Sequence, residues 1–253
     1  MGFFSKKNKQ KRPHVTAVIA AAGASSRMGG ENKLFAPILG TPVIALTLLA
    51  FEQCDDITDI VISASSDAII PIGDICKEYN ITKVITILRG GETRAESVLA
   101  ALLNAPPEAE FAAIHDGARP LVKPYLISDV VQCAIKHSAA VPVVPLTDTI
   151  KIMDGTTIVS TPDRSSLGAA QTPQVFEVGL IKGALTKSLD ITDDAQAVER
   201  MGIHIKTVPG HDSNIKITIP EDLMIAEALM TGPGRCPAGQ CGGTAPEPPI
   251  MKG

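Results

Sequence analysis

The sequence predicts an α/β fold in which a mostly parallel β-sheet carries helices on both faces. Short apolar runs alternate along the chain with segments of helical periodicity, and this alternation favours a parallel sheet. The runs are apolar throughout, as DIVISA at 59–64 and AAVPVV at 139–144 show, which is typical of strands covered on both sides. One two-stranded segment breaks the alternation and is expected to protrude from the sheet as a hairpin arm.

The expected elements follow from these periodicities, taken in chain order. Apolar runs predict strands at 15–21, 59–64, 83–88, 111–115 and 139–144. Between them, apolar residues at helical spacing predict helices at 42–53, 71–79, 93–103 and 124–137. In such a Rossmann-like arrangement, ligands collect at the carboxyl ends of the strands.

The interruption lies at 149–160, where two short runs flank Asp154-Gly155. Asp-Gly between such runs predicts a β-hairpin with a type I′ turn. Because a lone hairpin is at best marginally stable in water, it should pack against something, and a second subunit is a natural candidate. We expect the wider segment 146–172 to form this arm and to join two copies of the chain.

After the arm, the pattern predicts helices at 193–201 and 220–230 and strands at 203–208 and 214–218. Thr218 and Glu221 have capping-box spacing around Pro220, which favours a helix start there. Residues 231–253 are rich in Pro and Gly, so we expect a disordered tail. At the other end, residues 1–14 predict a flexible basic leader, and the domain proper is expected to span 15–230.

Composition narrows the functional classes. The chain has 253 residues, of which 45% are hydrophobic and 20% charged, as in a globular protein with a large core. No apolar run reaches the ~18 residues that span a bilayer, so we expect no membrane association. Five of the 23 basic residues lie in the leader, which leaves 18 against 27 acidic ones, and this balance disfavours nucleic-acid binding. Five scattered cysteines suit a reducing cytoplasm.

A glycine-rich loop, AAAGASSRMGGENK at 20–33, follows the first expected strand. It matches neither the dinucleotide fingerprint, which needs G-x-G-x-x-G, nor the P-loop, which needs Lys-Ser or Lys-Thr after its last glycine. Small residues around Gly23 would let backbone N–H groups approach a polyphosphate. Arg27 and Lys33 would add positive charge where a phosphoryl transition state develops negative charge. An ordinary strand-to-helix turn with two solvated cations is the alternative.

A second polar cluster, HDGARP at 115–120, directly follows another expected strand. Asp116 is placed to hold Mg²⁺, which prefers carboxylate and phosphate oxygens, and Arg119 could bind a phosphate. The alternative is an Asp-Gly turn beside a surface arginine. His115 is expected in the core rather than as a general base.

Two further clusters complete the set. In RGGETRAES at 89–97, Gly90 and Gly91 permit close approach of a flat ligand such as a base, which Ser97 could hydrogen-bond. A loop that caps the next helix is the alternative. In NIKIT at 214–218, Lys216 faces away from its apolar neighbours, toward a phosphate or toward solvent. Cationic groups, an acid for a metal and no activated Ser or Cys together favour phosphoryl or nucleotidyl transfer.

Seven segments, in this order, resemble the 2-C-methyl-D-erythritol 4-phosphate cytidylyltransferase family. They are AAAGASSRMGGENK, GGETRAESV, HDGARP, PLTDTIK, TPDRSSLGAAQTPQVF, ITDDAQAVE and NIKITIPEDL. The resemblance covers about 15–230. It implies an enzyme of the non-mevalonate isoprenoid pathway that joins CTP to a sugar-alcohol phosphate, releases pyrophosphate and requires Mg²⁺.

The resemblance also implies a role for each matching position. The residues implied in CTP binding are Ala21, Ala22, Gly23, Ala24, Gly90, Gly91, Ser97 and Asp116, with Asp116 also holding the metal. Those implied in catalysis are Arg27, Lys33 and Lys216, and those implied in binding methylerythritol phosphate are Arg119, Thr149, Arg164 and Thr192. The resemblance further implies a homodimer whose arm crosses between subunits, so that Arg164 and Thr192 act on the neighbour's site.

Three rival functions stay open at this point. A ribitol-5-phosphate cytidylyltransferase shares the loop, the acid and the lysine, but Thr149 and Arg164 match ligands of methylerythritol phosphate. A Rossmann oxidoreductase is disfavoured because the first loop lacks the dinucleotide fingerprint. A non-catalytic nucleotide-binding protein is expected to have lost Lys33 or Asp116, and both are present.

Overall fold

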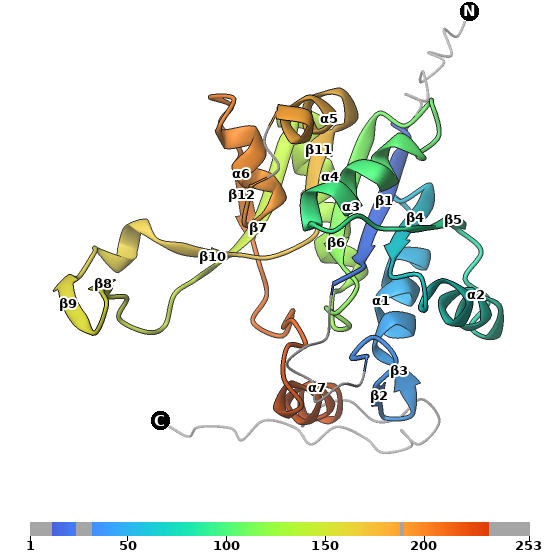
Figure 1. Ribbon diagram of the computed structural model, residues 1–253, viewed down its shortest axis with the longest axis horizontal. Coiled ribbons are helices and arrows are strands. Elements are labelled where there is room, and N and C mark those ends of the chain that lie inside the picture. The colour runs from blue at the N-terminus through green and yellow to red at the C-terminus, as the bar shows by residue number, and fades with distance from the viewer. Residues whose placement is uncertain (1–11, 24–31, 188–189, 233–253) are drawn as a thin grey trace, which may run out of the picture.

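The computed structural model describes residues 12–23, 32–187 and 190–232 and contains a central eight-stranded sheet (Figure 1). The strands of this sheet are β1 Val15–Ala21, β4 Asp59–Ala64, β5 Val84–Arg89, β6 Phe111–Asp116, β7 Ala139–Pro145, β10 Gly168–Ala170, β11 Gln174–Glu177 and β12 Lys206–Pro209. They run in the order β10-β7-β11-β6-β1-β4-β5, and β12 pairs with β7. The predicted α/β class with a mostly parallel sheet is confirmed.

β1 lies in the middle of the parallel half, between β4 and β6. Both ladders are in continuous register, and β1 runs from Thr16 opposite Asp59 to Ala21 opposite Ala64. The strand is buried on both faces, because Ile19 packs into one hydrophobic core and Val18 into the other. Parallel alignment brings the carboxyl ends of β1, β4, β5 and β6 to one edge of the sheet, where the sequence places three of its polar clusters.

The other half of the sheet departs from the sequence prediction. No strand was predicted at 168–170 or 174–177, yet β10 and β11 form there. β11 lies antiparallel between β6 and β7, so these two strands do not pair with each other. β10 also runs antiparallel along β7, on the same side as β11, and β12 pairs with the other side of β7. Runs of three or four residues have no readable periodicity, and their pairing depends on strands distant in the sequence.

Helices cover both faces of the sheet, as predicted (Figure 1). Their bounds are α1 Val43–Glu52, α2 Ile69–Glu78, α3 Arg94–Leu103, α4 Pro124–His137, α5 Val178–Lys187, α6 Asp194–Glu199 and α7 Glu221–Thr231. α1, α2 and α4 pack on one face, and α3, α5 and α6 on the other. α5 was not predicted, and α6 is shorter than the predicted 193–201. No described helix is long and apolar enough to cross a bilayer.

Each face has its own hydrophobic core. On the α1 side, Phe51 and Leu48 are fully buried together with Ile72 of α2. On the α3 side, Phe176 of β11 is fully buried with Leu102 of α3. Burying a side chain of this size contributes about 1.5–3 kcal/mol to the free energy of folding. The sheet is therefore held rigidly between two packed layers, with its carboxyl-end edge left for a site.

The predicted arm protrudes from the sheet as a hairpin of β8 (Ile152–Asp154) and β9 (Thr157–Ser160) (Figure 1). Its turn lies one residue later than predicted, because Asp154 pairs with Thr157 and the loop is Gly155-Thr156. Of these two residues only Gly155 has a positive φ, +55°, which fits a type II′ turn and not the predicted type I′. The exposed residues of the arm include the apolar side chains Ile152, Met153, Ile158 and Val159.

The predicted strand at 214–218 is wrong, since this segment pairs with no described strand. It is fixed instead at Ile217, whose side chain is fully buried and whose N–H donates to the Ala118 carbonyl at 2.8 Å. Apolar and polar residues do alternate in this segment, but the alternation does not lead to pairing with another described strand. Two short strands that were not predicted, β2 (Pro37–Ile38) and β3 (Thr41–Pro42), form a separate pair.

The predicted leader and tail fall mostly outside the described residues. Of the leader, His14 is held in place, because its backbone N–H donates to Glu110 Oε1 at 3.1 Å. Its ring Nε2 lies 2.5 Å from Asp59 Oδ2. Of the tail, Thr231 belongs to the last turn of α7.

Ser138 ends α4 in the left-handed conformation, with a φ of +66°. Glycine adopts this conformation without the Cβ strain that serine carries, although it also gives the unfolded chain more freedom. We expect Ser138→Gly to raise the free energy of unfolding by about 0.5–1 kcal/mol, measured by urea denaturation. Ser138→Ala is the matched control, because alanine keeps the strain. A stabilised alanine variant would contradict the explanation.

Candidate active site

A cavity of about 330 Å³ opens at the edge of the sheet where β1, β5 and β6 end. Its lining is drawn from stretches of chain that are far apart in the sequence. The lining residues are Ala20, Ala21, Ala22, Gly23, Lys33, Leu34, Gly91, Glu92, Thr93, Arg94, Ser97, Asp116, Ala118 and Lys216. Most residues predicted to bind CTP or to act in catalysis are thus brought together. Ala24 and Arg27 lie outside the described residues.

Two glycines let the β5–α3 loop close tightly beside the cavity. A Cβ on Gly90 would lie 2.5 Å from the Ala22 Cβ and 2.7 Å from Ser97 Oγ. A Cβ on Gly91 would lie 2.3 Å from the Glu96 Cβ. The packing of the protein itself therefore requires glycine at both positions. Their predicted contact with the base of CTP stays a prediction.

α3 begins at the cavity with a complete capping box. Thr93 Oγ1 accepts from the Glu96 N–H at 3.1 Å, and Glu96 Oε2 accepts from the Thr93 N–H at 3.1 Å. The alternative interpretation of this loop as a helix cap is confirmed, and the same loop also lines the cavity. The hydroxyl of Ser97 donates to the Thr93 carbonyl at 2.9 Å, which fixes its position against the cavity wall.

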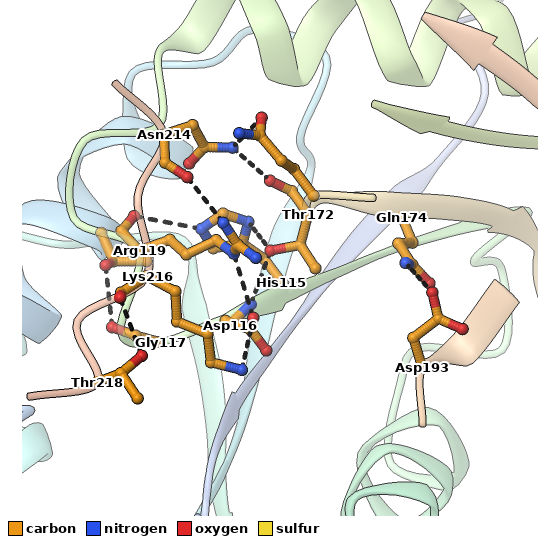
Figure 2. A network of polar contacts seen from close by, with 12 residues as sticks. His115, Asp116, Gly117, Arg119, Thr172, Gln174, Asp193, Asn214, Lys216 and Thr218 are labelled. Atoms are coloured by element: carbon orange, nitrogen blue, oxygen red, sulfur yellow. Dashed lines mark hydrogen bonds and ion pairs between the residues drawn. The ribbon is translucent and has the colours of Figure 1, made fainter. Parts of the chain in front are cut away.

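Asp116, at the end of β6, lies among three cationic side chains. Its Oδ1 accepts from Arg94 Nη1 at 2.5 Å, and its Oδ2 accepts from Lys216 Nζ at 3.0 Å and Arg119 Nε at 3.2 Å. Figure 2 shows Lys216 and Arg119 converging on this carboxylate. Burial raises the pKa of Asp116, but the three cations outweigh burial and hold the pKa well below its usual range. The carboxylate is therefore ionised whenever the protein is folded near neutral pH.

Arg94 is shared between Asp116 and a second buried carboxylate. Its Nη2 and Nε donate to Asp194 Oδ2 at 2.8 and 3.2 Å. Asp194 is the first residue of α6, and its side chain is fully buried. Burial raises the pKa of Asp194, and Arg94 offsets part of that rise. The two carboxylates in turn raise the pKa of Arg94 against the effect of its burial, so the guanidinium stays charged.

His115 lies in the core next to this network. Its ring centroid is 4.9 Å from that of Phe51, and the residue is fully buried. The ring Nε2 of His115 lies 3.4 Å from the Arg119 carbonyl, and because a carbonyl can only accept, Nε2 carries the proton. The other ring nitrogen, Nδ1, therefore accepts from the Thr172 hydroxyl at 3.0 Å. Burial lowers the pKa of His115 to about 3. The expectation that His115 is a core residue is confirmed.

Asn214 anchors the segment that carries Lys216. The side-chain amide of Asn214 donates to the Thr172 carbonyl at 2.9 Å, and the backbone carbonyl of Asn214 accepts from Arg119 Nη1 at 2.7 Å (Figure 2). These two bonds at Asn214 and the burial of Ile217 fix the segment on both sides of Lys216. Lys216 thus lines the cavity, with 43% of its side chain exposed, instead of extending into open solvent.

The predicted ligands of methylerythritol phosphate are not all brought together. Arg119 lies beside the cavity through its bonds to Asp116 and Asn214. Thr149 and Arg164 are exposed in the arm, and Thr192 is exposed in the loop before α6. None of these three lines the cavity in the part of the chain that the structure describes. Within a single chain, this half of the predicted site is therefore dispersed.

Asp116 has the right chemistry to hold Mg²⁺ with a bound triphosphate. Mg²⁺ in phosphate sites uses one or two carboxylates together with phosphate oxygens and water. A carboxylate has about four acceptor positions, and the three ion pairs occupy three of them. A cage of three or more His, Cys, Asp or Glu side chains is absent from the described residues. Any ion here would therefore rely on Asp116 and the ligand's phosphates.

Comparison with known proteins identifies the family. Residues 15–232 match the family model described as 2-C-methyl-D-erythritol 4-phosphate cytidylyltransferase. The chain belongs to this family. A curated 2-C-methyl-D-erythritol 4-phosphate cytidylyltransferase from Dehalococcoides mccartyi is 44% identical over 218 residues, which cover 85% of this chain and 96% of that protein. One from Halalkalibacterium halodurans is 42% identical over 220 residues, with coverage of 85% and 96%.

Solved structures of 2-C-methyl-D-erythritol 4-phosphate cytidylyltransferases have the same fold. The 4-diphosphocytidyl-2C-methyl-D-erythritol synthase of Anaerococcus prevotii aligns with a TM-score of 0.77 at 29% identity, over 86% of this chain and 96% of that one. The Thermus thermophilus cytidylyltransferase aligns with a TM-score of 0.71 at 33% identity, over 85% and 98%. The resemblance inferred from seven segments and the Rossmann-like fold are both confirmed.

Sequence reasoning missed three residues of the polar network around the cavity. Arg94, Thr172 and Asp194 all lie inside segments that carried the family resemblance. Arg94 directly follows the N-cap of α3, and Asp194 directly follows the N-cap of α6. For Arg94 and Asp194, the available signal was a charged residue that the cap does not need, whereas uncharged Thr172 gave no such signal. The signal could not show which charges would meet.

We expect Gly90→Ala to lower the free energy of unfolding by about 1–3 kcal/mol, because the new methyl group would overlap Ala22 and Ser97. Urea denaturation measures the effect. Gly183→Ala is the control: this glycine lies inside α5, where a Cβ meets nothing within 4 Å. Alanine there should raise the free energy of unfolding by about 0.5–1 kcal/mol. Equal effects of the two substitutions would contradict the packing argument.

Proposed function

We propose that this protein transfers a cytidylyl group from CTP to 2-C-methyl-D-erythritol 4-phosphate, giving 4-diphosphocytidyl-2-C-methyl-D-erythritol and pyrophosphate in the non-mevalonate isoprenoid pathway. The observation that carries the proposal is a cavity in which Lys33, Lys216 and Asp116 meet, in a chain of this family. Its relatives are named for methylerythritol phosphate, which favours this substrate over ribitol 5-phosphate.

The reaction needs positive charge more than it needs a general base. The attacking group is a phosphate oxygen, which is already an anion, so no proton has to be removed. This oxygen bonds to the α-phosphorus of CTP as the bond to the departing pyrophosphate oxygen breaks on the opposite side. Lys33 and Lys216, both in the cavity wall, would offset the repulsion between the two anions and the charge of the transition state.

The remaining cavity residues, and Arg119 beside the cavity, have proposed roles that match their positions. The backbone at Ala21, Ala22 and Gly23 would support the triphosphate at the end of β1. Gly91 and Ser97 would contact the cytosine. Arg119 contacts Oδ2 of Asp116, whereas Arg94 contacts Oδ1. Arg119 would bind the phosphate of the second substrate.

We infer that Asp116 holds Mg²⁺ through its remaining acceptor position. Bound there with the phosphates of CTP, the ion would neutralise part of their charge. Arg94, Arg119 and Lys216 hold the Asp116 carboxylate in place and ionised, and their positive charge means that Mg²⁺ would bind there together with the anionic triphosphate.

We propose that two copies of the chain associate through the arm. Ile152, Met153, Ile158 and Val159 are 50–63% exposed on a hairpin that would be marginally stable alone. A partner that covers them would stabilise the hairpin and remove apolar surface from water. Arg164 and Thr192, which do not reach the cavity of their own chain, would then serve the cavity of the partner.

A cytoplasmic location is part of the same proposal. Cys54, Cys76 and Cys133 are free thiols, and free cysteines are typical of a reducing compartment. Burial raises the pKa of Cys76 to about 11, which makes this thiol unreactive at neutral pH.

We expect pyrophosphate release when the protein is given Mg²⁺, CTP and methylerythritol phosphate, and none when ribitol 5-phosphate replaces the latter. Lys33→Ala should lower kcat by roughly 100- to 1,000-fold, because one preorganised charge at the α-phosphate is lost. Lys77→Ala is the control, since the Lys77 side chain is 82% exposed and pairs only on the surface of α2. Release with ribitol 5-phosphate alone would move the function to the rival substrate. No release with either would contradict the transferase proposal.

Mixed dimers test whether Arg164 acts across the interface. Lys33→Ala and Arg164→Ala should each be nearly inactive as pure proteins. If each site combines Lys33 of one subunit with Arg164 of the other, unfolding and refolding an equal mixture should restore about a quarter of the wild-type activity, since half of the dimers regain one intact site. If both residues serve the same subunit's cavity, no intact site can form, and a mixture that stays inactive would contradict the crossed arrangement.

A further inference from the structure

Arg94 connects the cavity to a carboxylate that lies outside it. Its Nη1 donates to Asp116 Oδ1 at 2.5 Å, while Nη2 and Nε both donate to Asp194 Oδ2, at 2.8 and 3.2 Å. Arg94 and Asp116 line the cavity, whereas Asp194 is not among its described lining residues. The side chain of Asp194 is fully buried. Asp194 therefore reaches the site through Arg94.

The cap of α6 does not need a charge at this position. The preceding residue, Asp193, already caps α6 by accepting from the Gln196 N–H at 3.0 Å, and it also accepts from the side chain of Gln174 at 2.9 Å (Figure 2). Asp194 Oδ1, by contrast, is buried with no hydrogen-bond partner among the described residues. A buried carboxylate with an unsatisfied oxygen is unfavourable, and apolar packing is often at least as stable. The charge of Asp194 therefore serves something other than the stability of α6.

The geometry of the contact shows what this charge does. A guanidinium group is planar, and Nε and Nη2 form one edge of it. Because Asp194 binds this edge, the plane of the Arg94 guanidinium is fixed and its remaining nitrogen, Nη1, is directed at Asp116. Asp116 is in turn held between Arg94 on one oxygen and Lys216 on the other. The orientation of Arg94, and with it the contact that holds Oδ1 of Asp116, thus depends on Asp194.

We propose that Asp194 is a positioning residue for the transfer reaction: it fixes Arg94, and thereby sets Asp116 and Lys216 in the arrangement that the transition state needs. This inference rests on the proposed function. Because two nitrogens of the Arg94 guanidinium donate to Asp194 Oδ2, the two side chains form an ion pair, and replacing this carboxylate makes the surroundings of the cavity more positive. Binding of the CTP triphosphate is then kept or strengthened, while an unrestrained Arg94 disturbs Asp116 and slows the chemical step.

The first part of the test compares the steady-state kinetics of pyrophosphate release. We expect Asp194→Asn to lower kcat by roughly 10- to 100-fold, as is typical for residues that orient a site from behind, with the KM for CTP unchanged or lower. Asp193→Asn is the matched control, because asparagine still caps α6 and this residue does not bond to Arg94; its kinetics should stay close to wild type. Arg94→Lys keeps the charge but loses the planar fork, and it should show the same fall in kcat.

The second part of the test needs no activity. Thermal unfolding of Asp116→Asn, Asp194→Asn and the double variant measures how strongly the two carboxylates are coupled. Each single variant still offers Arg94 one carboxylate, whereas the double variant leaves the guanidinium with neither. We therefore expect the fall in melting temperature of the double variant to exceed the sum of the two single falls.

A loosened fold would give a different pattern. The proposal is overturned if Asp194→Asn raises the KM for CTP and lowers kcat no more than Asp193→Asn does. If Asp194→Asn does not fold, the kinetics of Arg94→Lys decide this part of the test. Additive falls in melting temperature would also overturn it, because the two carboxylates would not act on a common arginine. If the wild type releases no pyrophosphate with either substrate, the proposed function fails, and the unfolding measurements alone decide whether Asp194 orients Asp116.

Discussion

Asp116 is almost removed from water, and it stays ionised because Arg94, Arg119 and Lys216 surround it. A buried carboxylate without such partners would take up a proton or destabilise the fold by several kcal/mol. Each cation comes from a different part of the chain: the start of α3, the turn after β6 and the segment before α7. The charge balance of the site therefore exists only when all three parts are folded in register with the sheet.

The sheet supplies that register. β1, β5 and β6 end at one edge because they are parallel, and the two hydrophobic cores hold them there from both faces. The antiparallel strand β11 adds a further support, because Thr172 just before it accepts from the Asp116 N–H at 3.2 Å and donates to His115. A strand that the sequence did not predict thus helps β1 to hold the end of β6 in position.

The sequence was sufficient to predict those elements whose signal lies within a single short segment of the chain. Long apolar runs and helical periodicity placed the parallel strands and most helices, and polar residues after the strands placed the cavity. It failed where the outcome depends on contacts between distant segments. β11 is four residues long and forms a strand through its pairing with β6 and β7. Apolar and polar residues do alternate at 214–218, but none of the described strands pairs with this segment. The meeting of Arg94 with Asp194 likewise requires α3 and α6 to share a face, which no local pattern reveals.

The order of the strands also has a consequence for synthesis of the chain. β7 pairs with β10, β11 and β12, all of which are made after it. A growing chain that has reached Pro145 can complete the parallel half of the sheet, but β7 has no described strand to bind until residues 168–177 have emerged. During that interval its apolar edge and the open side of β6 are exposed, as unpaired edges that attract other chains. Synthesis of residues 146–177 is therefore a period in which unpaired strand edges expose this protein to aggregation.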